Sequence, residues 1–194
     1  MKDSLIFASN NLHKVEEIRS ILGNDFDILT LKEAGINIEI PEPHETLEEN
    51  ALEKSGTILL LTGKNCFSED TGLEVEALCG EPGVKSARYA GVGSSADANT
   101  EKLLYNLTAT DNRKARFRTV IALMLDGKEL LFEGICTGTI ITGKRGAFGF
   151  GYDPVFIPDG STQTFAEMNM TEKNKFSHRK KAVEKLVAYL KKYD

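Results

Sequence analysis

Two stretches with the character of strands meet at Asp126-Gly127, and this arrangement constrains the fold more than any other feature of the chain. Asp-Gly is a preferred sequence for a tight hairpin turn because both positions tolerate a positive φ. The stretch before it, 115–125, has the period of two that is typical of a strand, and the stretch after it, about 129–142, offers a partner strand. We therefore predict a long antiparallel hairpin. The residues expected on one face of its first strand are Phe117, Thr119, Ile121 and Leu123.

Helical patterns lie before and after this hairpin. Leu5 to Ala8 reads as a short buried strand, and the polar residues that follow suit the N-cap of a helix ending at Gly23. Thr46-Leu47-Glu48-Glu49 is a capping box that opens a second helix running to Thr62-Gly63. A shorter helix is predicted over 97–107, and a last helix begins near Ser177. The predicted class is α/β, in one domain over residues 1–194.

Composition excludes several classes of protein. The chain has 194 residues, and its 24 basic against 29 acidic side chains give a net charge of -5. Binding to nucleic acid or to a membrane surface needs concentrated basic charge, so we expect neither partner. No apolar run approaches the roughly 20 residues that span a bilayer. The three cysteines, Cys66, Cys79 and Cys136, are widely spaced and predict buried thiols in a cytoplasmic protein.

One segment has nearly the spacing of a phosphate-binding loop. Gly138 to Arg145 contains Gly, four residues, Gly and Lys, but Arg145 stands where the loop needs Ser or Thr to hold magnesium. Ile140-Ile141-Thr142 also has the composition of a strand rather than of a curve of glycines. We interpret the segment as a hairpin strand that ends in a basic turn.

Two polar segments near the start are candidate functional segments, and the first is a candidate for binding phosphate. Ser9, Asn10, Asn11 and Lys14 lie where a strand gives way to a helix, and the free N–H groups of a helix N-terminus bind anions. Plain helix capping with a surface lysine explains the same residues equally well. The second segment, 40–46, contains Glu42 and Glu45 just before a helix, where acidic residues commonly complement the helix dipole.

A third segment has adjacent acids at a predicted strand end. Glu69 and Asp70 follow an apolar stretch and precede Gly72, which would permit a tight turn. Magnesium takes oxygen ligands, so carboxylates that face a phosphate site are its expected ligands. The alternative is a solvated turn, which is the commoner role of Glu-Asp-Thr-Gly. Lys85 and Arg88, a little further on, suit either phosphate contacts or surface ion pairs.

The fourth segment combines aromatic rings with polar groups. Aromatic side chains between glycines can offer a flat face to a purine, and neighbouring charged groups can contact its edge. The aromatic residues can equally belong to the core. Together the four segments predict a magnesium-dependent enzyme that acts on a nucleoside triphosphate. The residues concerned are Phe150, Gly151, Tyr152, Asp153, Lys173, Ser177, His178 and Arg179.

In order along the whole chain, these segments resemble the signatures of the inosine triphosphate pyrophosphatase family of dITP/XTP pyrophosphatases. Ser9 to Lys14 is similar to its Thr/Ser-x-Asn-x-x-Lys segment, and Glu48-Glu49-Asn50-Ala51 with Lys54 to its Glu-Asn-Ala-x-x-Lys helix. The matches continue at Ser68 to Leu73, Pro82 to Gly91, Phe150 to Pro154 and Ser177 to Arg179. The family fold is an elongated mixed β-sheet flanked by helices, with two lobes, a central cleft and usually a homodimer.

The resemblance implies a reaction and a set of roles. Water would attack the α-phosphorus of ITP, dITP or XTP, giving the nucleoside monophosphate and pyrophosphate. Asp70 would be the general base, and Glu42, Asp70 and Glu69 would be the candidate Mg²⁺ ligands. Ser9, Asn10, Asn11, Lys14 and Thr71 would bind phosphates. Phe150, Gly151, Tyr152, Asp153, Lys173, Ser177, His178 and Arg179 would bind the base and the rest of the substrate.

Donor groups also predict which base is preferred. A 6-oxo purine presents an acceptor at position 6, so His178 and Arg179 would favour it, whereas the amino group of adenine would set donor against donor. The chain departs from the family pattern at Glu69, where Asp is usual, at Thr71, where Ser is common, and at Lys180, where Gly is frequent. The longer acid at position 69 is the departure that bears on metal geometry.

Three other functions are alternatives to this hypothesis. A related pyrophosphatase acting on dTTP, UTP or modified pyrimidines would not need the donors of Ser177-His178-Arg179. A catalytically silent nucleotide sensor is suggested by Glu69 alone. A plain interaction module leaves the coincidence of four polar segments unexplained.

Overall fold

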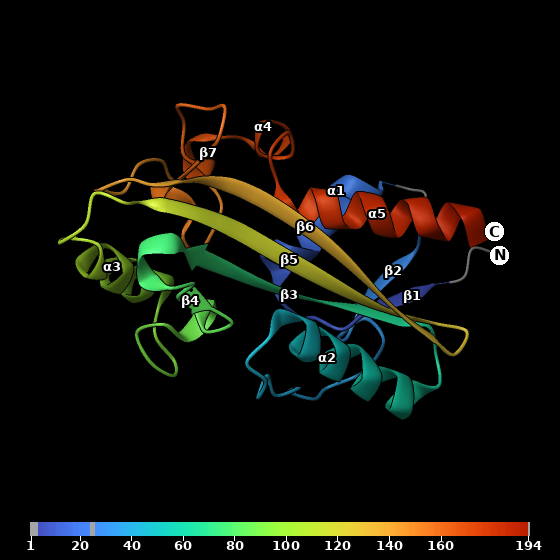
Figure 1. Cartoon of the computed structure of the whole chain (residues 1–194). Helices are drawn as coiled ribbons and strands as arrows, with labels where there is room; N and C mark the ends of the chain where they lie inside the picture. The colour runs from blue at the N-terminus through green and yellow to red at the C-terminus, as the bar shows by residue number, and fades with distance from the viewer. Residues whose placement is uncertain (1–3, 24–25, 194) are drawn as a thin grey trace. The chain divides into compact units, whose positions relative to one another are not determined.

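The computed structural model describes residues 4–23 and 26–193 (Figure 1). Its strands are β1 Leu5–Phe7, β2 Ile28–Thr30, β3 Cys66–Val75, β4 Pro82–Gly83, β5 Lys114–Leu125, β6 Lys128–Ile140 and β7 Phe156–Pro158. Its α-helices are α1 Leu12–Leu22, α2 Leu47–Thr62, α3 Ala96–Asn106, α4 Met170–Lys173 and α5 His178–Tyr193.

The strands form one seven-stranded mixed sheet. Its order is β2-β1-β3-β5-β6-β7, and β4 pairs with β3. β1 pairs in parallel with both β2 and β3, while the β3–β4 and β6–β7 pairs are antiparallel. This mixed sheet flanked by helices confirms the predicted α/β class.

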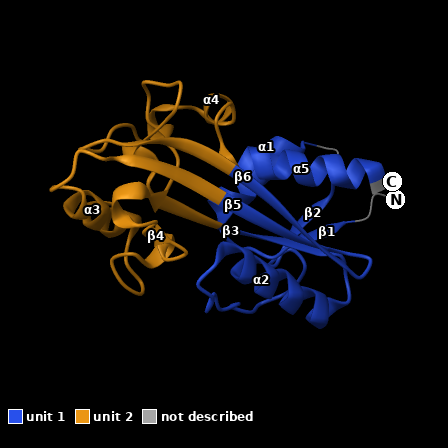
Figure 2. Cartoon of the chain, viewed as in Figure 1, with its two compact units in different colours: residues 1–70, 119–134, 179–194 blue, residues 71–118, 135–178 orange. Residues whose placement is uncertain are grey.

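The chain divides into two compact units (Figure 2). Unit 1 comprises residues 1–70, 119–134 and 179–194, and unit 2 comprises 71–118 and 135–178. Strands β3, β5 and β6 each contribute residues to both units. The single domain expected over residues 1–194 stays a prediction.

In unit 1, helices cover both faces of the sheet. Phe7 and Phe67, stacked with ring centroids 4.8 Å apart, lie in a cluster with apolar residues of α1 and α5. Ile6 and Cys66, the residues just before them, lie in a second cluster with Ile58 of α2. This division follows from the alternation of side chains along a strand. Figure 1 shows α1 and α5 on one side of these strands and α2 on the other.

Unit 2 has its own core. Leu103 and Leu107, at the end of α3, pack with buried residues of β3, β5 and β6. Phe117 contacts Phe156 edge to face, with ring centroids 4.8 Å apart, and Phe165 also joins this group. Burying aromatic rings in this way removes large apolar areas from water.

Local signals in the sequence predicted several boundaries correctly. The Asn11 side chain accepts a hydrogen bond from the Lys14 N–H at 3.2 Å, and Gly23 ends α1. Thr46 caps α2, and Gly63 ends it with φ 64°. Asp126 and Gly127 both have positive φ, 50° and 75°, as the predicted tight turn between β5 and β6 requires. The helix 97–107 is α3, and the helix near Ser177 is α5.

The prediction of a strand end and turn at Glu69-Asp70-Thr71-Gly72 was wrong. All four residues lie inside β3, which continues to Val75. Gly72 permits close strand pairing rather than a turn, because a Cβ there would lie 2.6 Å from the carbonyl oxygen of Gly83. The strand therefore extends past the acids to pair with β4.

The cysteine prediction was wrong in one respect. Cys66 and Cys136 are buried thiols, but Cys79 is exposed. It follows a short 3-10 helix and has a left-handed φ of 52°. Among the helices of residues 4–23 and 26–193, none combines the length and apolar character needed to cross a membrane.

Candidate functional site

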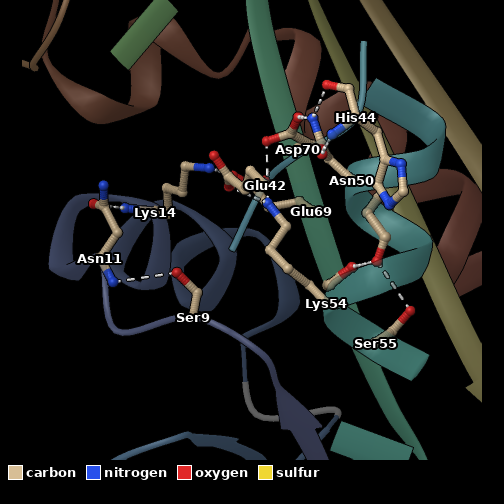
Figure 3. Close-up of polar contacts among 12 residues, drawn as sticks. Ser9, Asn11, Lys14, Glu42, His44, Asn50, Lys54, Ser55, Glu69 and Asp70 are labelled. Carbon is tan, nitrogen blue, oxygen red and sulfur yellow. Dashed lines mark hydrogen bonds and ion pairs between the residues drawn. The ribbon is translucent and has the colours of Figure 1, made fainter. Parts of the chain in front are cut away.

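The first part of the site lies where β1 leads into α1. Ser9 Oγ accepts a hydrogen bond from the Asn11 N–H at 3.2 Å, so this turn is held by its own side chains (Figure 3). The Asn10 side chain accepts a hydrogen bond from the Lys32 N–H at 3.1 Å and so ties the turn to the segment after β2. Lys14, one turn into the helix, extends its amine to 3.1 Å from Glu69 Oε1.

Lys54 of α2 joins two carboxylates. Its Nζ lies 2.6 Å from Glu42 Oε1 and 3.0 Å from Asp70 Oδ1. Only 8% of the Lys54 side chain and 7% of the Asp70 side chain are exposed, so this contact is shielded from water. Burial alone would lower the pKa of Lys54, but the charges of Asp70 and Glu42 raise it, so the amine keeps its proton.

Asp70 has the electrostatics of a candidate base. Burial raises the pKa of its carboxyl group above the usual range. The charges of Lys54 and Lys14 partly offset this effect, while that of Glu42 adds to it. Groups whose pKa is shifted by burial and nearby charge are common at catalytic sites.

Asn50 fixes the loop that carries Glu42. Its side chain accepts a hydrogen bond from the His44 N–H at 3.0 Å and donates one to the His44 carbonyl oxygen at 3.1 Å. The same amide nitrogen lies 3.4 Å from Asp70 Oδ2. Asn50 therefore holds both the Glu42 loop and Asp70 against α2, as Figure 3 shows.

Asn50 and Lys54 belong to the segment that resembles the family's Glu-Asn-Ala-x-x-Lys helix, but neither was among the predicted site residues, although a further signal was present. The two residues share the buried stripe of α2 with apolar Leu47, Ala51 and Ile58. A long charged side chain is almost never fully buried unless it is paired. A lysine at an apolar-stripe position thus predicts buried acidic partners.

Glu69 points away from Asp70. Neighbouring residues on a strand face opposite sides of a sheet, so Asp70 meets α2 whereas Glu69 meets α1 and α5. Glu69 accepts two hydrogen bonds from Arg179, from Nε at 2.7 Å and from Nη2 at 3.0 Å. Arg179 Nη1 also donates to Glu17 of α1. The result is a network of two carboxylates, from Glu69 and Glu17, and two cationic side chains, from Arg179 and Lys14.

This network changes the pKa of Glu69. Burial would raise that pKa, but the charges of Arg179 and Lys14 outweigh it and lower the value to about 2. The ionised carboxylate therefore stabilises the fold above pH about 4.5, its ordinary pKa, and that contribution is lost as the pH falls towards 2.

We expect Glu69→Gln to weaken the pH dependence of stability between pH 5 and 2 by roughly 3 kcal/mol, the equivalent of the pKa shift. Urea unfolding at a series of pH values measures it. Glu16→Gln, at an exposed position on α1, is the matched control and should behave as the native chain. Identical acid profiles for the native chain and Glu69→Gln would contradict this account.

Unit 2 contains the aromatic part of the predicted site. Asp153 accepts hydrogen bonds from the Phe150 N–H at 2.8 Å and from Lys173 Nζ at 2.7 Å. The same amine lies 5.2 Å from the centroid of the Phe150 ring. Glycine at position 149 allows the Asp153 carboxylate to approach the backbone this closely, since a Cβ there would lie 2.1 Å from Asp153 Oδ2. Phe150, Asp153 and Lys173 therefore form one connected group.

Other predicted residues of unit 2 are part of its core. The His178 ring stacks on Phe117, with centroids 4.7 Å apart and planes at 12°. Tyr152 is buried, and its hydroxyl donates to the Ser86 carbonyl oxygen at 2.9 Å. Ser177 is also buried, whereas Gly151 is partly exposed with φ 62°.

The structure thus sorts the predicted site residues into two groups. Unit 1 holds Ser9, Asn10, Asn11, Lys14, Glu42, Glu69, Asp70 and Arg179. Unit 2 holds Thr71, Phe150, Gly151, Tyr152, Asp153, Lys173, Ser177 and His178. Arg179, expected at the edge of the base, contacts Glu69 and Glu17, and its contact with a base stays a prediction.

Glu42 and Asp70 fit a divalent cation. One ammonium group already lies within 3.0 Å of an oxygen from each, which shows that a single cation can reach both. Within residues 4–23 and 26–193 there is no cluster of three or more acidic, histidine or cysteine side chains suited to a metal. Magnesium commonly uses one or two carboxylates and completes its shell with water and substrate phosphates. The carboxylates of Glu42 and Asp70 suit this way of binding magnesium.

A buried acid of raised pKa, a paired lysine and a neighbouring helix N-terminus define a site of the kind used on phosphate compounds. The chain belongs to the Ham1 family, whose model matches residues 5–189.

Individual relatives match over nearly their full length. A dITP/XTP pyrophosphatase of Porphyromonas gingivalis is 52% identical over 97% of both chains. Another of Christiangramia forsetii is 48% identical over 97% of this chain and 99% of the relative. The solved structure of the Staphylococcus aureus Ham1 protein has a TM-score of 0.90 at 38% identity and covers 99% of this chain and 100% of that one.

Proposed function

We propose that this protein hydrolyses non-standard purine nucleoside triphosphates, dITP, XTP and ITP, to the monophosphate and pyrophosphate. The buried cluster of Asp70, Lys54 and Glu42 carries the proposal, because it supplies a base and a cation site in a chain of the Ham1 family. The names of the relatives, dITP/XTP pyrophosphatases, support the substrate class.

Asp70 acts as the general base. Its carboxylate takes a proton from water as the water oxygen bonds to the α-phosphorus, and the bond from that phosphorus to the bridging oxygen breaks. Pyrophosphate leaves with the electron pair. The raised pKa of Asp70 makes it a stronger base than an exposed aspartate. Asn50 contacts one oxygen of Asp70 and orients it.

Charge on the substrate is balanced by groups of unit 1. Mg²⁺ held by Glu42 and Asp70 would neutralise phosphate charge and polarise the phosphorus. The N-terminus of α1, capped by Asn11, offers N–H groups to a phosphate, and Lys14 contributes a positive charge beside them. Glu69 contacts Arg179 and Lys14, and its ligation of a metal stays a prediction.

Groups of unit 2 would recognise the base. Phe150 is partly exposed and lies under the Lys173 amine, so its ring can pack on a purine while Lys173 and His178 offer donors. Donors match the acceptor at position 6 of hypoxanthine or xanthine and meet the amino group of adenine unfavourably. The expected homodimer, the cytoplasmic location and the absence of nucleic-acid and membrane partners stay predictions.

Substrate profiling tests the function. We expect pyrophosphate release from dITP, XTP and ITP with magnesium, with kcat/KM at least 100-fold above that for ATP. Mismatched buried donors commonly discriminate by this much or more. GTP and dTTP complete the panel, and EDTA removes the metal. Release mainly from dTTP would place the protein with the pyrimidine enzymes, and nucleotide binding without release would make it a sensor.

A further inference from the structure

Lys54 lies where a metal ion shared by Glu42 and Asp70 would have to bind. Its ammonium contacts one oxygen of each carboxylate, at 2.6 and 3.0 Å. All three groups come from separate segments of unit 1: the loop before α2, α2 itself and β3. The lysine is therefore a cation supplied by the chain to two acids that would otherwise repel each other.

The ammonium and a divalent ion compete for the same place. Like charges a few ångströms apart repel strongly where water is excluded, and the side chains of Lys54 and Asp70 are both less than one-tenth exposed. A divalent ion on these oxygens is therefore incompatible with the ammonium in its present position. Lys54 has a flexible four-carbon stem, so it can move while the backbone stays in place.

Asn50 keeps the two acids in place without Lys54. Its paired hydrogen bonds to the His44 backbone hold the loop that carries Glu42, and its amide also lies 3.4 Å from Asp70. The carboxylate pair thus has an anchor that does not depend on the lysine. Departure of Lys54 would leave two acids already arranged for a divalent ion.

We propose that Lys54 is a displaceable internal counter-ion, which neutralises Glu42 and Asp70 in the free protein and leaves them when metal enters with the nucleotide. It keeps the metal affinity of the nucleotide-free protein low, so that metal and substrate bind together. The inference rests on the metal ligands assigned in the proposed function and adds a role for a residue outside that set.

Mn²⁺ binding to the nucleotide-free chain, followed by electron paramagnetic resonance, tests the proposal. We expect Lys54→Met to bind Mn²⁺ at least about tenfold more tightly than the native chain, because a competing charge about 3 Å from both acids is gone. Lys64→Met removes the same charge from an exposed position and should match the native chain. Circular dichroism confirms that each variant is folded.

A second measurement uses the native chain and does not depend on the stability of Lys54→Met. In protein labelled with ¹³C at lysine Cε, the Lys54 signal is assigned from its absence in Lys54→Arg. We expect this signal to shift when MgCl₂ and α,β-methylene-ITP are added together, but to stay in place with the analogue and EDTA. A signal unchanged by both additions, or one shifted by the analogue alone, would overturn the proposal.

The outcomes separate this inference from the proposed function. If folded Lys54→Met binds Mn²⁺ no more tightly than Lys64→Met, the counter-ion role is wrong, while magnesium-dependent pyrophosphate release by the native chain would still support the function. If the native chain releases pyrophosphate equally well in EDTA, the metal assignment itself fails, and the counter-ion role fails with it.

Discussion

Asp70→Asn is expected to slow pyrophosphate release from dITP about 10²- to 10⁴-fold, the usual contribution of a general base. Asparagine keeps the shape of the side chain and its capacity to accept a hydrogen bond from Lys54, but it does not take up a proton from water. The native rate should also fall in acid as Asp70 is protonated, with an apparent pKa above the ordinary 3.8 of aspartate because burial raises it. Steady-state kcat/KM against pH measures both effects.

The matched control for this variant is Asp111→Asn, at an exposed position of the loop before β5. It makes the same chemical change and should leave kcat/KM and its pH profile as in the native chain. A folded Asp70→Asn protein within fivefold of native activity would remove Asp70 from the role of base.

Arg179→Met is expected to lower the free energy of unfolding by about 3–5 kcal/mol, the usual cost of removing one partner from a buried ion pair. The Arg179 side chain is 1% exposed, and its loss leaves the carboxylates of Glu69 and Glu17 buried without their shared cation. Since single domains are stable by only about 5–15 kcal/mol, this is a large fraction of the total. Urea unfolding at neutral pH measures the change.

Arg116→Met is the control for that experiment. Its guanidinium contacts Glu74 at 2.6 Å, but the Arg116 side chain is 49% exposed, so its loss should cost no more than about 1 kcal/mol. Adding Glu69→Gln to Arg179→Met removes one stranded charge and should restore part of the lost stability. Equal losses for Arg179→Met and Arg116→Met would show that burial of this network does not matter.

Much of the secondary structure could be predicted because its signals are local. Asn11 and Thr46 begin helices through hydrogen bonds that reach only three residues along the chain. Asp126-Gly127 turns the hairpin through its own backbone angles. By contrast, β2, β4 and β7 are two or three residues long, too short to show a period, and exist because neighbouring strands pair with them.

The candidate site divides in the same way. The residue types at positions 14, 69 and 70 indicated phosphate and metal chemistry without a structure, whereas Glu42 was assigned to the metal only through the family resemblance. Gly72, however, suggested a turn, because sequence alone does not distinguish a glycine that needs a positive φ from one that makes room for Gly83. Placing Asp70 inside β3 depended on that distinction.

By itself, the sequence determined the α/β class, the caps of α1 and α2, the hairpin turn and the chemical character of the polar segments, since all of these depend on residues close together in the chain. Only the tertiary structure decided that Glu69 and Asp70 face opposite sides of β3, one towards Arg179 and the other towards Lys54. Those partners lie 110 and 16 residues away along the chain, and which face each acid takes follows from the pairing and register of the strand in the sheet.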